Sequence, residues 1–254
     1  MKSKQCINKN WLKMKDLKKI ISEKKLFHSG MKNVVQYLLA KNIKLEELNG
    51  IELFGGTGET DIFLAEKLKT FEIWEIDRSC FTELKKKFSK SKINICNSVE
   101  KLEKEYDDSK FDIIVMDNPM NVYGPNNEST KYCEHFDILK NIYKLINKES
   151  IVIFLVNKKP FFYNKLYEKN LIWKNRRKEF YGDIDVENID CTYLIKFYEE
   201  YFKKLKLETI FSKNIMRHHP HLDYFIFRVR KNEVKSINNI DWISLNPLLE
   251  RYKK

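Results

Sequence analysis

The sequence predicts an α/β protein with a Rossmann-like, mostly parallel seven-stranded sheet and helices on both of its faces. The first observation is that short apolar runs alternate with helical patterns from residue 50 onward. This alternation is typical of βαβ units. The second observation is a glycine-rich turn at 55–58, directly after the first apolar run. In open α/β sheets, ligands bind at such a turn.

The apolar runs predict seven strands, at 51–54, 72–76, 92–96, 111–116, 150–156, 207–211 and 222–229. Parallel strands need crossover connections, and the helical patterns that supply them lie near 59–69, 78–89, 98–105, 130–147 and 191–205. In the last strand the residues alternate, so one face is expected to carry Tyr224, Ile226 and Arg228 and the other Phe225, Phe227 and Val229.

The domain boundaries follow from changes in these patterns. Residues 1–48 are expected to form an N-terminal helical extension, because apolar residues recur at helical spacing on both sides of a break at Ser29-Gly30. Residues 49–230 would form the main domain and 231–254 a tail. The aromatic and charged stretch 160–190 is a candidate substrate-recognition insertion.

Composition bounds the function classes. The net charge of +12 favours a polyanionic partner, although a composition rich in Lys, Asn and Ile produces such a charge without one. The five cysteines are scattered and form no C-x-x-C pair, which indicates neither a disulfide framework nor a zinc site. No apolar run reaches the roughly 18 residues of a membrane span, and no signal peptide is visible. We therefore expect a cytoplasmic protein without a membrane partner.

The glycine turn is the main candidate for cofactor binding. Three of the seven glycines in the chain fall at Gly55, Gly56 and Gly58, where they let a ligand approach the main chain and the N–H groups of the next helix. The dinucleotide fingerprint and the P-loop lysine are both absent. An acidic residue within the strand, Glu52, favours S-adenosylmethionine as the cofactor; Phe54 and Thr57 complete the expected contacts. The alternative is an ordinary glycine turn.

Two further strand ends carry polar candidates. Glu75 follows the glycine turn by about 20 residues, the spacing at which an acidic side chain accepts the hydroxyl groups of a ribose. Asp77 is the competitor for this role, and Ile76 between them is also expected to contact the cofactor. At the third strand, Asn97 and Ser98 are expected to meet an adenine or to cap a helix.

The fourth strand ends in the candidate catalytic residues Asp117, Asn118 and Pro119, of which Asp117 is also expected to contact the cofactor. An exocyclic amine is a poor nucleophile, so acceptors around its hydrogens must orient its lone pair toward the methyl donor. The Asp117 carboxylate or the Asn118 amide oxygen, with a main-chain carbonyl near Asn118-Pro119, would do this, and positioning would supply most of the acceleration. Tyr123 is expected to stack on the substrate base. The alternative is a strand-ending turn.

Residues 51–124 resemble a class I S-adenosylmethionine-dependent methyltransferase, with the glycine turn as first motif and residues 117–120 as fourth. Asp117-Asn118-Pro119-Met120 resembles the tetrad of amino-methyltransferases that act on nucleic-acid bases. Residues 75–78 are similar to the Glu-Ile-Asp-Arg of ribosomal RNA adenine dimethyltransferases. The resemblance implies methylation of an amino nitrogen in a nucleic-acid base, in RNA rather than DNA. Phe54 replaces that family's glycine, and Met120 replaces the aromatic residue that stacks on the base.

Three readings stay open at this stage. Besides a nucleic-acid methyltransferase, the chain could methylate a small molecule or a protein, or it could bind a polyanion without catalysis. Residues 176–178 (Arg-Arg-Lys) would grip phosphates or form a solvated face. The histidines His218, His219 and His221 are neighbours in an extended segment and cannot easily converge, so no metal site is expected; a substrate contact or a polar loop is expected instead.

Overall fold

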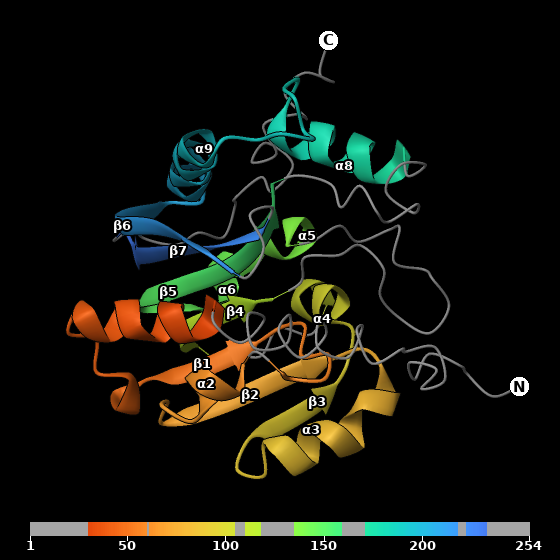
Figure 1. The fold of residues 1–254 in the computed structure, drawn as a ribbon, viewed down its shortest axis with the longest axis vertical. Helices are drawn as coiled ribbons and strands as arrows, with labels where there is room; N and C mark the ends of the chain where they lie inside the picture. The colour runs from red at the N-terminus through yellow and green to blue at the C-terminus, as the bar shows by residue number, and fades with distance from the viewer. Residues whose placement is uncertain are drawn as a thin grey trace, which may run out of the picture.

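The computed structural model describes residues 30–59, 61–104, 110–117, 135–158, 171–217 and 222–232. In this part of the chain seven strands form one sheet with the order β3-β2-β1-β4-β5-β7-β6 (Figure 1). The strands are β1 (Asn49–Glu52), β2 (Thr70–Glu75), β3 (Lys92–Ile95), β4 (Phe111–Met116), β5 (Ile146–Asn157), β6 (Leu207–Met216) and β7 (Leu222–Lys231). Strands β1 to β5 run parallel, while β7 is antiparallel to both of its neighbours. The predicted mostly parallel seven-stranded sheet is confirmed.

Helices cover both faces of this sheet (Figure 1). One face carries a helix at 30–40, then α2 (Ile62–Ala65) and α3 (Phe81–Lys87), with the short 3-10 helices η2 (Leu45–Glu47) and η3 (Arg78–Cys80) in the connections. The other face carries α4 (Ser98–Lys104), α5 (Phe136–Leu139), α6 (Ile142–Leu145), α8 (Leu171–Tyr181) and α9 (Cys191–Lys204). None of the described helices is both long and apolar enough to span a membrane.

Strand β7 shows why the sheet has two separate cores. Tyr224 and Ile226 pack in the core that includes Met31, Val34 and Leu38 of the helix at 30–40. Phe225, Phe227 and Val229 pack in the larger core on the opposite face. The alternation predicted for this strand is confirmed, and both faces are buried because a core packs against each side of the sheet.

Several boundaries differ from the sequence prediction, and long-range strand pairing explains two of them. In the described part of 130–147, two short helices, α5 and α6, replace the single helix that was expected; α6 ends at Leu145, and β5 begins at once with the fully buried Ile146. Ile146 pairs with Phe111 of β4 ahead of a register shift, so a long-range strand pairing overrides the local helical pattern. Strand β6 also runs beyond its predicted end at residue 211 to Met216, because it pairs with β7 along its whole length.

The stretch 160–190 contains α8, and its basic residues do not all face solvent. Arg177 is fully buried. Its Nε donates to the carbonyl of Val186 at 3.1 Å, and its guanidinium lies 5.2 Å from the ring centroid of Tyr181. The prediction of a phosphate contact or a solvated face is therefore wrong for Arg177, while Lys178 is exposed. Residues 1–29 and 159–170 lie outside the described residues.

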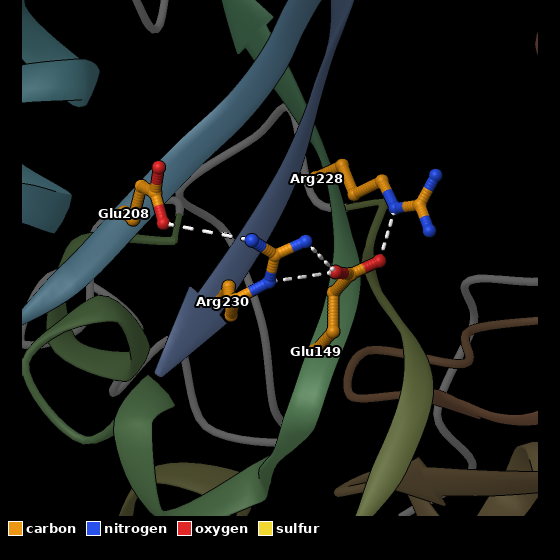
Figure 2. Close-up of polar contacts among 4 residues, drawn as sticks. All are labelled: Glu149, Glu208, Arg228 and Arg230. Carbon is orange, nitrogen blue, oxygen red and sulfur yellow. Dashed lines mark hydrogen bonds and ion pairs between the residues drawn. The ribbon is translucent and has the colours of Figure 1, made fainter. Parts of the chain in front are cut away.

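Ion pairs join the last three strands near the amino end of β5 (Figure 2). Glu149 on β5 lies between two arginines of β7: it pairs with Arg228 and, at 2.9 Å, with Arg230. Arg230 also lies 3.8 Å from Glu208 of β6. Since Glu149 lies opposite Arg230 in the β5–β7 register, this cluster favours that register over a shifted one.

Candidate functional site

The candidate site lies at the carboxyl edge of the sheet, where β1 and β4 are neighbours. The chain continues from β1 toward β2 on one side and from β4 toward β5 on the other, so this is the switch point at which open α/β sheets bind ligands. The glycine turn follows β1 here. It is held by two hydrogen bonds, from Gly55 N to Trp74 O at 2.9 Å and from Gly58 N to Gly55 O at 2.8 Å.

The three glycines of this turn serve different purposes. A Cβ at Gly55 would lie 2.3 Å from Ile73 Cγ2, and one at Gly58 would lie 2.2 Å from Phe88 Cε2. Both are therefore required by packing. Gly56 has a φ of +50°, and a Cβ there would meet nothing within 4 Å. Gly56 thus presents bare backbone to open space, which leaves room for a ligand at the switch point.

Glu75 connects the end of β2 to the glycine turn. Its Oε2 accepts a hydrogen bond from Gly56 N and its Oε1 one from Asp77 N, both at 2.6 Å. Burial raises the pKa of this carboxyl group, an effect that backbone hydrogen bonds from Asp77, Gly56 and Ile76 oppose. Asp77, the competitor of Glu75, caps η3 by accepting from Ser79 N at 2.8 Å. Ile76 between them is 39% exposed and offers apolar surface beside the turn.

The two residues predicted at the end of the third strand, Asn97 and Ser98, form hydrogen bonds with the protein backbone. Asn97 caps α4, since its Oδ1 accepts from Val99 N at 3.1 Å and from Glu100 N at 3.3 Å. The Ser98 hydroxyl is buried and donates to the carbonyl of Leu53 at 2.5 Å. The helix-cap alternative thus describes Asn97, and Ser98 supports the end of β1.

Phe54 and Thr57 of the glycine turn lie in different surroundings. The side chain of Phe54 is half-buried against the larger core. Thr57 is exposed, and its carbonyl accepts from Lys87 Nζ at 2.7 Å. The Lys87 contact ties the outer part of the turn to α3.

Beneath the turn lies a buried cluster of charged and polar side chains. Glu52 Oε1 accepts from Phe54 N at 2.8 Å and from Asp117 N at 3.3 Å. Asp117 Oδ2 accepts from the Tyr224 hydroxyl at 2.8 Å, and its Oδ1 lies 3.3 Å from Arg217 Nη1. Asp61, which precedes α2, completes the cluster.

Burial changes the acid–base properties of this cluster. Desolvation raises the pKa of Glu52 well above its ordinary value, and the charges of Asp61 and Asp117 add to the effect. The pKa of Asp61 is raised to about 8 by burial and by Asp117. Burial likewise raises the pKa of the Tyr224 hydroxyl well above its ordinary value, so it remains a neutral donor.

Sequence reasoning found Glu52 and Asp117 but missed a site role for Asp61, Arg217 and Tyr224. Asp61 lies three residues after Gly58, and this proximity was the one local signal. Arg217 and Tyr224 reach the cluster only through the pairing of β5, β6 and β7. The backbone at Arg217 also packs closely against the helix at 30–40, since a Cβ at Gly30 would lie 2.7 Å from Arg217 Cα.

The remaining sequence candidates lie outside the described residues: Asn118, Pro119, Met120, Tyr123, His218, His219 and His221. Within the described part of the chain, no three His, Cys, Asp or Glu side chains are grouped so that they could hold a metal ion. The cluster of Glu52, Asp61 and Asp117 is therefore a charge cluster without the geometry of a metal site.

No model of a known protein family matches the chain, and neither does any curated protein. Solved structures do show similarity. TYW2 from M. jannaschii, solved with AdoMet, is 10% identical, with 88% of this chain and 80% of that chain covered and a TM-score of 0.46. PH1948 from Pyrococcus horikoshii, provisionally assigned as an RNA methyltransferase, is 15% identical, with 79% and 83% covered and a TM-score of 0.48.

A third similar structure is the tRNA m1G37 methyltransferase of M. jannaschii, at 15% identity and a TM-score of 0.43, with 77% of this chain covered; the match spans 48% of that chain, about half its length. At such identities the roles of individual residues must come from this chain's own geometry. The strand order β3-β2-β1-β4-β5-β7-β6, with β7 antiparallel to its neighbours, gives this chain a Rossmann-like α/β fold with one antiparallel strand.

Proposed function

We propose that this chain is an S-adenosylmethionine-dependent methyltransferase. The observation that carries the proposal is the geometry at Gly56. Its N–H group is held by Glu75, its Cβ direction is open space, and it lies at the β1–β4 switch point. Gly56 has a left-handed backbone and no side chain, and it lies beside the buried carboxylate of Glu75. This arrangement favours a ligand with hydroxyl groups for the carboxylate and a second part that packs against the glycine backbone.

The cofactor fits this edge by its chemistry. A carboxylate has about four acceptor positions, and Glu75 accepts from the backbone N–H groups of Gly56, Asp77 and Ile76. A remaining position would accept a hydroxyl group of a ribose. Ile76 supplies apolar surface for an adenine ring, and the bare backbone at Gly56 leaves room for the amino-acid portion. When bound, the cofactor supplies an electrophilic methyl group.

The substrate that we propose is an amino nitrogen of a nucleic-acid base, in RNA rather than DNA. The Asp117 carboxylate faces Tyr224 and Arg217, so we assign it the task of fixing the start of the segment that follows β4. The acceptor role then falls to the Asn118 amide oxygen and a main-chain carbonyl near Asn118-Pro119. The net charge of +12 supports a polyanionic substrate.

Calorimetric titration with S-adenosylmethionine tests the cofactor assignment. We expect binding by the wild-type chain and its loss in Gly56→Trp, because the indole would fill the open space. Ser89→Trp, at an exposed position of a surface turn, is the matched control and should retain binding. Unchanged binding in Gly56→Trp would refute the placement of the cofactor.

A methyl-transfer assay with radiolabelled cofactor tests the substrate class. The acceptors are total tRNA, ribosomal RNA, DNA and cell extract, each offered separately. We expect label in RNA. Label in extract but in no nucleic acid would point to the small-molecule or protein alternative. Failure to bind the cofactor would leave a non-catalytic polyanion-binding protein as the better description.

A further inference from the structure

Two carboxyl groups of the buried cluster each have one oxygen atom without a hydrogen-bond donor among the described residues. Glu52 and Asp61 are 0% and 2% exposed. Among the described residues, Glu52 Oε2 and Asp61 Oδ1 are buried and receive no hydrogen bond. The Asp61 carboxyl group lies within hydrogen-bonding reach of that of Glu52. Two ionised carboxylates have only acceptors to offer each other, so such a pair is satisfied by a proton held between them.

The charges around the pair make this proton necessary. Asp117 faces it from the end of β4 and adds a third carboxyl group, while Arg217, after β6, is the cation that faces it; Tyr224 of β7 is a neutral donor. Among the described residues, three carboxyl groups thus lie close together near the guanidinium of Arg217. A buried charge without compensation is costly, and burial raises the pKa of Asp61 to about 8.

The pair also lies where the charge of a ligand at the switch point would act on it. Glu52 Oε1 accepts from Phe54 N, one residue before the glycine turn, and from Asp117 N on the opposite side of the β1–β4 switch point. A cation held at this crevice would favour the ionised form of both carboxyl groups, and the effect is strong where water is excluded. S-adenosylmethionine carries two positive groups, a sulfonium and an ammonium.

We propose that Glu52 and Asp61 hold one proton between them in the free protein and release it to solvent when the cationic cofactor binds beside them. The proposal rests on the proposed function, because it takes S-adenosylmethionine as the ligand. The charges balance: a cation enters, one proton passes to the buffer, and the pair changes from one negative charge to two, so the added negative charge is the counter-ion of the cation. The pair acts through charge and is not assigned a direct contact with the cofactor.

Calorimetry in two buffers of different ionisation enthalpy, both at pH 7, measures this proton. We expect release on the order of one proton per cofactor bound, because a group with a pKa of about 8 is mostly protonated at pH 7. The Kd should accordingly fall by up to about tenfold per pH unit between pH 6 and 8. S-adenosylhomocysteine lacks the sulfonium. Equal release with it identifies the ammonium as the compensating charge, and smaller release identifies the sulfonium.

Asp61→Asn is the decisive variant. An asparagine imitates the protonated carboxyl group and can donate to Glu52, so the fold should be kept. We expect proton release near zero and a Kd that no longer depends on pH in this range. Glu46→Gln removes an exposed carboxyl group at the opposite edge of the sheet and should behave as wild type. Cofactor binding by the wild type without proton exchange would overturn this inference alone, whereas absence of binding would overturn the proposed function as well.

Discussion

Replacing Gly58 by alanine is expected to destabilise the protein much more than replacing Gly56, although both lie in one turn at positive φ. The left-handed conformation costs a non-glycine residue roughly 1–2 kcal/mol at either position. At Gly58 (φ +65°) the new Cβ would also lie 2.2 Å from Phe88 Cε2 and 3.0 Å from Leu84 Cδ2, both in buried side chains. Overpacking of this kind adds about 1–3 kcal/mol. Gly58→Ala should therefore cost about 2–5 kcal/mol and Gly56→Ala about 1–2 kcal/mol.

Denaturant-induced unfolding measures the difference, provided that the m-values of the two variants agree. A second variant isolates the packing cost: Phe88→Leu should recover part of the loss in Gly58→Ala and none of the loss in Gly56→Ala, as a double-mutant cycle would show. Equal destabilisation by the two alanines would refute the assignment of Gly58 to packing and of Gly56 to open space.

Three further predictions follow from the buried polar groups. Because the pKa of Asp61 is raised in the folded state to about 8, its contribution to stability is full below pH 4 and is lost as pH rises through about 8; the free energy of unfolding should fall over that window by up to about 1.4 kcal/mol per pH unit, and Asp61→Asn should flatten the decline. An unchanged slope in that variant would contradict this. Tyr198→Phe removes the hydroxyl that contacts both His135 and Tyr181 in the core and should cost about 1–3 kcal/mol in thermal or denaturant unfolding; a loss within experimental error would show that the network contributes nothing. Glu75→Gln should weaken S-adenosylmethionine binding in calorimetry by about tenfold, or 1.4 kcal/mol, because an amide offers fewer acceptor positions to a ribose, and an unchanged Kd would remove Glu75 from the site.

Much of the fold was predictable because several of its strands are buried apolar runs. The limits of β4 at 111–116 and the two faces of β7 follow from pattern alone. The α8 region was not predictable in this way. Arg177 is polar in sequence but buried in structure, because Val186 and Tyr181 satisfy its guanidinium, and these partners are not visible in a local pattern.

The candidate site likewise contains residues that local sequence patterns predict and residues that they do not. Glu52, Gly56 and Glu75 stand at strand ends and follow from the strand–turn–helix order. Arg217 and Tyr224 reach Asp117 through strand pairings that span about half the chain, and no local motif indicates such partners. The capping role of Asn97 was open in the sequence, since a polar residue at a strand end also precedes a helix.

The position of β7 in the sheet affects how the chain folds during its synthesis. It is the last of the seven described strands in sequence, yet it lies inside the sheet, and β6 pairs with β7 alone among them. On the ribosome, β1 to β5 can pair before β7 is synthesised, but the outer edge of β5 then stays open and β6 has no strand to join. Open edges of this kind invite pairing with other chains. Tyr224 lies on the same strand, so the segment that closes the sheet also brings the hydroxyl group to Asp117, and nascent chains should acquire the charge cluster only when their sheet is complete.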